Sequence, residues 1–235
     1  QIGAWRVRIS RARNLIKDSW PLILSGLAIM VYMRIDQIML GQMLGDESVG
    51  IYSAAVKISE VWYFIPMTVV ASVFPSIIEA KKQNETLYYD RLQKLYDIMV
   101  LVALTVAILM TFLSDWVVTL LFGKAYLEAS TVLSVHIWAG IFVFLGVASG
   151  KWFIIEGLQR YSFYRTLLGA IVNIVSNFFL ISKYGIIGAA IATFFSQIIA
   201  AYIFDIICLK TRVLFWMKTR ALYAPFLFFK IRGRQ

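Results

Sequence analysis

The sequence predicts an all-α, polytopic membrane protein, built as a bundle of six transmembrane helices. Hydrophobic residues make up 60% of the 235 residues and charged residues only 15%, whereas soluble domains average about 25% charged residues. A soluble domain of this length exposes too much surface to hide so many apolar side chains, but lipid solvates them directly. The chain contains no alternating ten-residue segments of the kind that build a membrane β-barrel, so we expect helices.

Six mainly uncharged runs are each long enough, at 1.5 Å per residue, to cross a hydrocarbon core of roughly 30 Å. In chain order the predicted helices are 19–41, 50–78, 96–114, 130–155, 162–181 and 186–209. The first follows a basic stretch and ends in a Gly-rich, acidic turn. The hydrophilic link from Glu79 to Lys94 separates the second from the third. The fourth contains one charged residue, Lys151, near its inner end, and the turn Lys183-Tyr184-Gly185 separates the last two.

Both ends of the chain are basic. Residues 1–18 place Trp5, Ile9 and Ile16 on one narrow helical face between arginines, as in an amphipathic helix that lies on the cytoplasmic leaflet. A solvated linker with incidental apolar residues is the alternative. Residues 19–209 form the predicted six-helix lobe, and residues 210–235 are expected to be a basic cytoplasmic tail.

Most of the 23 lysines and arginines fall in the termini and in the second and fourth connections. The positive-inside rule therefore places both termini in the cytoplasm. The net charge of +10 indicates contact with anionic membrane lipid. We expect no nucleic-acid partner, because the basic residues are scattered over separate segments.

Cysteine and histidine limit the chemistry of the chain. The single cysteine, Cys208, and the single histidine, His136, exclude an internal disulfide, a thiolate cluster and a multi-histidine metal site. We therefore expect neither a metal nor a cofactor. Because the chain opens at Gln1 rather than at a methionine, we expect a fragment or a processed chain.

Four sequence strings, in this order and spacing, resemble one known family. They are Met33-Arg34-Ile35-Asp36-Gln37-Ile38-Met39-Leu40-Gly41, Val49-Gly50-Ile51-Tyr52-Ser53-Ala54-Ala55, Leu121-Phe122-Gly123-Lys124-Ala125-Tyr126 and Tyr184-Gly185-Ile186-Ile187-Gly188-Ala189-Ala190-Ile191-Ala192-Thr193. From about Leu15 to Leu209 the chain is similar to the C-terminal half of bacterial polysaccharide repeat-unit (O-antigen-type) flippases, of the multidrug/oligosaccharidyl-lipid/polysaccharide exporter superfamily.

The resemblance implies two pseudo-symmetric six-helix lobes, of which this chain would be the second. It also implies a location in the bacterial inner membrane, with an N-terminal lobe of the same protein and a lipid-linked oligosaccharide as partners.

Ionisable residues inside spans are costly and therefore mark candidate sites. The first span contains Arg34 and Asp36, and the second contains Lys57 and Glu60. Arg34 and Lys57 lie about seven residues from the turn that joins their helices, hence roughly 10 Å below the outer surface. One interpretation is a cationic lining, with Glu60 beside it, that binds the pyrophosphate of a lipid-linked glycan. The other is a structural ion-pair knot between two helices.

Further polar residues and two prolines inside the spans are also candidate functional residues. By analogy with the family, Asp36 is a candidate for a coupling cation or proton. Asn173 and Asn177 form a polar stripe on the fifth span, which suits interhelical hydrogen bonds or a contact with sugar. Pro66 and Pro75 lie within the second span and are predicted to interrupt the helix. The resulting bend either flexes during transport or is a static kink.

The predicted function is to flip a polyprenyl-pyrophosphate-linked oligosaccharide repeat unit across the inner membrane for cell-surface polysaccharide synthesis, without enzymatic chemistry. A multidrug or small-metabolite antiporter of the same superfamily is the first alternative, although Arg34 and Lys57 disfavour cationic drugs. A membrane glycan polymerase or glycosyltransferase is the second, which the short outer loops and the lack of an Asp-x-Asp motif disfavour.

Overall fold

The computed structural model describes residues 9–232, with side chains apart from those of residues 9–19, 21, 22, 25, 28, 31 and 226–232. All of the regular structure in this part of the chain is helical. The elements are α1 (Ile9–Leu44), α2 (Asp46–Val61), α3 (Phe64–Gln83), α4 (Glu85–Phe122), η1 (Lys124–Tyr126), α5 (Glu128–His136), α6 (Ala139–Ile155), α7 (Gln159–Ile198), η2 (Ile199–Ile203), α8 (Phe204–Ile207), η3 (Leu209–Thr211) and α9 (Arg212–Arg232).

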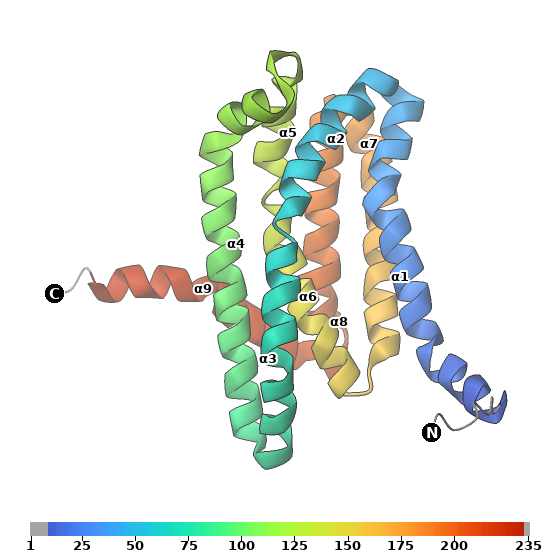
Figure 1. Ribbon diagram of the computed structural model, residues 1–235, viewed down its shortest axis with the longest axis vertical. Coiled ribbons are helices and arrows are strands. Elements are labelled where there is room, and N and C mark those ends of the chain that lie inside the picture. Colours follow the sequence, from blue (N-terminus) through green and yellow to red (C-terminus); the bar gives the residue numbers. More distant parts are fainter. Residues whose placement is uncertain (1–8, 233–235) are drawn as a thin grey trace, which may run out of the picture.

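The long helices stand side by side as an antiparallel bundle, and α9 crosses it (Figure 1). Helix α1 packs along α7, and α4 packs against α3, α5, α6 and α9. The α1–α2 turn, the α4–α5 connection and the bend of α7 lie at one end of the bundle, at the top of Figure 1, which we term the α1–α2 end. The α3–α4 and α6–α7 connections lie at the other, the α3–α4 end. The structure thus gathers the predicted outer turns at one end and the predicted inner links at the other.

Helix α7 is a helical hairpin that turns back at Gly185. The backbone there has φ 60° and ψ −139°, a left-handed conformation that glycine adopts at little cost. Asn173 and Ser196 are hydrogen-bonded at 3.5 Å, although 23 residues of straight helix would separate them by roughly 35 Å. The limbs approach so closely after the turn that a Cβ on Gly188 would lie 2.0 Å from the carbonyl oxygen of Leu180. The predicted boundary between the last two spans lies at this turn.

Within the described residues, three helical stretches are long and apolar enough to cross a membrane, and the bent pair α5–α6 makes a fourth. One of the three, Gln159–Ile207, includes the turn at Gly185 and therefore supplies two limbs. Large apolar side chains such as Phe112, Trp116 and Leu120 are exposed on α4, as expected for a helix that faces lipid. The count of six spans stays a prediction.

Helices extend beyond the predicted spans into the connecting segments. The hydrophilic link from Glu79 to Lys94 forms the end of α3 and the start of α4, with one break at Asn84. The Asn84 side chain caps α4 by accepting a hydrogen bond from the Thr86 amide at 2.7 Å, which is a strong helix-start signal. The predicted basic tail forms η3 and α9. The predicted amphipathic pattern of residues 1–18 lies outside the described side chains.

Two spans are interrupted at the same level of the bundle. The second span breaks at Trp62 and Tyr63, between α2 and α3, because Pro66 has no amide hydrogen to donate to the carbonyl of Trp62. Helix α3 continues without interruption through Pro75. The α5–α6 pair bends by 41° after His136, and the His136 Nδ1 atom is 3.0 Å from the Ser59 hydroxyl of α2.

The interior consists of two hydrophobic clusters. One, near the α3–α4 end, includes Tyr96, Phe144 and Phe153. The other, near the α1–α2 end, includes Leu40 and Leu133. Side chains at the two helix breaks, Trp62 and Trp138, pack against both clusters.

Candidate functional site

A buried carboxylate, Asp36, lies at the centre of a polar cluster between α1, α2 and the two limbs of α7. Its Oδ2 atom accepts hydrogen bonds from Tyr52 at 2.8 Å and Thr193 at 2.6 Å. Its Oδ1 atom accepts one from the amide of Asn177 at 2.5 Å. The hairpin turn at Gly185 brings Asn177 and Thr193 to opposite sides of the same carboxylate. The fold therefore brings together residues that lie up to 157 positions apart in the sequence.

The cluster continues along the limbs of α7. Asn177 donates to Asn173 at 3.2 Å, and Asn173 donates to Ser196 at 3.5 Å. The Ser196 hydroxyl lies 2.7 Å from the Tyr32 hydroxyl of α1. Both asparagines are fully buried, so the polar stripe of the fifth span binds its neighbouring helices and does not face lipid.

Among the described residues Asp36 has neutral hydrogen-bond partners and no cationic one. Among the described residues the ion pairs within 4 Å join Lys81 to Glu156, Lys82 to Glu79 and Lys218 to Asp205. A buried carboxylate without a cationic partner is costly, so such a group tends to bind a proton or a cation. The Asn177 Oδ1 atom is also buried and has no partner in the described part of the chain. The cluster thus offers oxygen atoms, the ligands that hard cations prefer.

A cavity of about 340 Å³ opens beside this cluster, between α1, α2, α3, α6 and α7. Asp36, Glu60 and Thr193 line one part of it, and Arg165 lines another. Asn177, which contacts Asp36, lies twelve residues beyond Arg165 on the same limb, which corresponds to roughly 18 Å along the helix. The cavity is therefore acidic toward the α1–α2 end and basic toward the α3–α4 end.

The predicted cationic lining of Arg34 and Lys57 stays a prediction. Both side chains are exposed, and neither is among the described residues that line this cavity, whereas the predicted Glu60 does line it. Arg34 lies near enough to Glu60 for its charge to act on that carboxylate. The predicted ion-pair knot is not formed within 4 Å, since no ion pair among the described residues joins these side chains.

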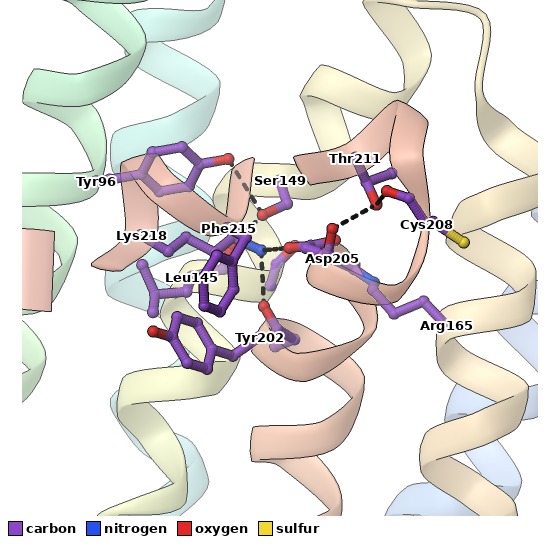
Figure 2. A network of polar contacts seen from close by, with 12 residues as sticks. Tyr96, Leu145, Ser149, Arg165, Tyr202, Asp205, Cys208, Thr211, Phe215 and Lys218 are labelled. Carbon is purple, nitrogen blue, oxygen red and sulfur yellow. Dashed lines mark hydrogen bonds and ion pairs between the residues drawn. The ribbon is translucent and has the colours of Figure 1, made fainter. Parts of the chain in front are cut away.

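A second buried polar network, absent from the sequence-based predictions, lies near the α3–α4 end (Figure 2). The Lys218 ammonium of α9 donates to Asp205 Oδ2 at 2.6 Å and to the carbonyl of Ala201 at 2.7 Å. Both side chains of the pair are fully buried. Burial lowers the pKa of Lys218 to about 8, although the neighbouring Asp205 carboxylate opposes the shift. The acceptor carbonyl belongs to η2, a single π-helical turn, a distortion that is frequent at functional sites.

Comparison with known proteins identifies the family. The model of a family described as polysaccharide biosynthesis protein matches residues 2–131, more than half of the chain. The chain belongs to this polysaccharide biosynthesis protein family. It is 24% identical over 193 residues to the capsular polysaccharide biosynthesis protein CapF of Staphylococcus aureus, covering 82% of this chain and 49% of that protein.

Two other relatives have names that refer to transport. A protein of Shigella dysenteriae named as an O-antigen transporter is 25% identical, over 80% of this chain and 48% of its own length. A protein of Haloferax volcanii named as a low-salt glycan biosynthesis flippase is 24% identical, over 77% and 39%. The chain thus spans about half the length, or less, of these relatives.

The fold of this family member matches that of a solved structure. A crystal structure of MATE in the bent conformation superposes with a TM-score of 0.67 at 19% identity, covering 84% of this chain and 45% of that one. This similarity, together with the apolar helices, shows an all-α, multi-pass membrane protein. The names of these relatives refer to capsular polysaccharide biosynthesis, O-antigen transport and glycan flipping.

Proposed function

We propose that this family member is the second lobe of a carrier that flips a polyprenyl-pyrophosphate-linked oligosaccharide across the bacterial inner membrane. The observation that carries the proposal is the cavity of about 340 Å³ lined by Asp36, Glu60 and Arg165. Ionisable groups at membrane depth mark substrate or ion pathways, and carboxylates are good acceptors for the hydroxyl groups of sugars. An N-terminal lobe, matching the uncovered half of the relatives, would complete the pathway.

Asp36 is the proposed coupling site within this lobe. Its carboxylate accepts hydrogen bonds from three neutral side chains and touches the cavity. Binding of a proton or a small cation would remove the cost of its buried charge. Because Tyr52 lies on α2 and Thr193 on α7, the protonation or occupancy of Asp36 bears directly on how these helices pack. An ion can drive a conformational change only if its binding favours one packing of the helices over another.

Asp36→Asn in the full-length protein tests the proposal. The change keeps the size of the side chain and removes its charge, so the abundance of the protein should stay near wild type while export of the glycan falls at least tenfold. Surface polysaccharide and accumulated lipid-linked precursor are the two measurements. Asp46→Asn is the matched control, because Asp46 is exposed at the start of α2. Normal export by Asp36→Asn at normal abundance would contradict the proposed coupling role.

Arg34 and Lys57, which are exposed, have a different proposed role. Both side chains are exposed, so they are candidates for a surface that this lobe shares with the N-terminal lobe or with anionic lipid. Arg34→Ala in the full-length protein should reduce export if that shared surface carries substrate, and Arg34→Lys should restore it only in part, since lysine lacks the bidentate fork.

A drug or metabolite antiporter is the second candidate function. The acidic end of the cavity, at Asp36 and Glu60, suits a cationic small molecule, and the predicted argument against it from Arg34 and Lys57 does not apply to this cavity. Drug susceptibility of a deletion strain separates the two functions. Unchanged susceptibility with loss of surface polysaccharide supports the flippase, and the reverse result supports the antiporter.

A further inference from the structure

One face of α9 is exposed along the helix. It carries Arg212, Trp216, Arg220 and Tyr223, and the two aromatic side chains are 65% and 64% exposed. At 3.6 residues per turn, the spacing of these four residues keeps their side chains within about 80° of one another around the helix. Two guanidinium groups and two aromatic rings with polar tips therefore share one surface, which we term the α9 stripe.

The opposite face of α9 is fixed to the bundle. Leu214, Met217 and Ala221 are buried in the hydrophobic cluster near the α3–α4 end. Between them, the Lys218 ammonium pairs with the buried Asp205 carboxylate at 2.6 Å. The direction in which the α9 stripe points is therefore set by packing within the protein.

Helix α9 crosses α4 where the polar part of α4 ends. The Gln93 side chain of α4 donates a hydrogen bond to the carbonyl of Met217 at 3.0 Å. Positions 90–97 of α4 include four charged residues, whereas positions 98–114 include none and correspond to about 25 Å of helix. In Figure 1, α9 runs across the long helices and its C-terminal part projects beyond α4. This is the position of a helix that lies along the membrane surface at the α3–α4 end.

The chain around the α9 stripe is basic. Seven lysines and arginines follow Asp205 in the sequence, but no aspartate or glutamate does. Two acids beside α9 have other partners, since Asp205 pairs with Lys218 and Asp97 accepts a hydrogen bond from Gln93 at 2.8 Å. No carboxylate in the part of the chain that the structure describes forms an ion pair with the stripe. Its guanidinium groups are thus available to an external anion.

We propose that the α9 stripe binds the headgroups of anionic phospholipid in the leaflet at the α3–α4 end. Arginine binds phosphate oxygens through charge-assisted, bidentate hydrogen bonds. Tryptophan and tyrosine favour the headgroup region, because each ring combines an apolar body with a polar tip. The level at which α9 crosses α4 favours lipid over a soluble acidic partner. This inference does not depend on which ligand the cavity carries.

Quenching of Trp216 fluorescence by brominated lipid tests the inference. The full-length protein is placed in nanodiscs of equimolar phosphatidylglycerol and phosphatidylcholine, with bromine near the headgroup end of the acyl chains of one lipid or of the other. The difference between wild type and Trp216→Phe isolates the signal of Trp216. Phosphatidylglycerol should quench this signal at least about twofold more strongly than phosphatidylcholine, whereas random mixing gives equal quenching. Salt at about 1 M, where the Debye length is about 3 Å, should remove the preference.

The double variant Arg212→Gln with Arg220→Gln should be quenched equally by the two lipids, because it keeps the aromatic rings and removes both charges. Lys124→Gln with Lys183→Gln is the matched control. Both lysines are exposed and lie at the α1–α2 end, so the same change in net charge should leave the preference at Trp216 unchanged. Arg220→Gln alone should reduce the preference, and it decides the question if the double arginine variant does not fold.

Equal quenching by the two lipids in wild type, or no quenching of Trp216 by either lipid, would overturn the inference. A preference of wild-type size in the folded double arginine variant would also overturn it, because the lipid would then be held by other residues. The same holds for a wild-type preference in Arg220→Gln when the double variant is unfolded.

Discussion

The buried pair Lys218–Asp205 offers a quantitative test of the packing of α9 against the bundle. Both side chains are 0% exposed and their charged atoms are 2.6 Å apart. Asp205→Asn leaves the ammonium uncompensated, and Lys218→Met leaves the carboxylate uncompensated. Removal of one partner from a buried pair costs about 3–5 kcal/mol. Each single variant should therefore unfold at least about 3 kcal/mol more easily than wild type.

The double variant Asp205→Leu with Lys218→Met should be more stable than either single variant, because neither member of the pair is then left buried with an uncompensated charge. Apolar replacement of a buried pair is often neutral or stabilising. Here, however, the Ala201 carbonyl loses the hydrogen bond from Lys218, and a buried acceptor without a partner costs about 1–3 kcal/mol. We therefore expect the double variant to lie about 1–3 kcal/mol below wild type.

Unfolding of the purified full-length protein in mixed micelles of a mild detergent and SDS, followed by tryptophan fluorescence, gives these free-energy differences. The control is Glu156→Gln, which breaks the ion pair to Lys81. That pair has the same 2.6 Å distance but is 36% and 24% exposed, so its loss should cost at most about 1 kcal/mol. The reasoning is refuted if a single variant lies within about 0.5 kcal/mol of wild type, or if the double variant is the least stable.

Three further predictions concern the helix turns and the orientation. Gly188→Ala should destabilise the protein by about 1–3 kcal/mol in the same unfolding assay, because its Cβ would collide with the backbone of Leu180. Gly50→Ala is the control: a Cβ at Gly50 would meet nothing within 4 Å, so this variant should be neutral or slightly stabilising. Pro66→Ala restores an amide hydrogen at the break in the second span and should lower export while stability is kept; equal export would make the break a static kink. A reporter fused at Lys124 should give a periplasmic signal, and a cytoplasmic signal there would reverse the topology.

The pattern of uncharged runs predicted the helical fold because lipid selects apolar segments of a fixed length. The same signal could not predict the helix ends, since helices continue into water wherever the local sequence permits. The extension of α4 back to Glu85 is an example, because its hydrophilic first turns depend on the cap by Asn84 and not on hydropathy. Asn84 with Thr86 is a signal from which this start could have been predicted.

The sequence also identified Asp36, Glu60, Asn173 and Asn177 as polar groups inside spans, but not which of them meet. Their partners depend on the rotation of each helix and on the fold-back at Gly185. Arg165 lies within the otherwise uncharged fifth predicted span but was not among the predicted site residues.

Asp205 illustrates a stronger signal that the sequence-based prediction missed. It is an acidic residue within the predicted sixth span, and such a residue usually pairs with a basic one. Lys218, thirteen positions later in the supposed tail, provides it. The partner was missed because the tail was expected to be solvated and not folded against the bundle.

The two helix breaks lie at one level of the bundle and divide that part of the lobe into two halves, joined at this level. Helices α2 and α5 pack together on one side of it and α3 and α6 pack on the other, and the contact between Ser59 and His136 joins α2 to α5 within the first half. Each half has its own hydrophobic cluster, and α4 runs unbroken past both. Asp36 is bonded through Tyr52 to α2 in one half, whereas Arg165 is bonded to the Gly146 carbonyl of α6 in the other. Any change of angle at the breaks would therefore alter the distance between the acidic and basic ends of the cavity, and with it the size of ligand that fits between them.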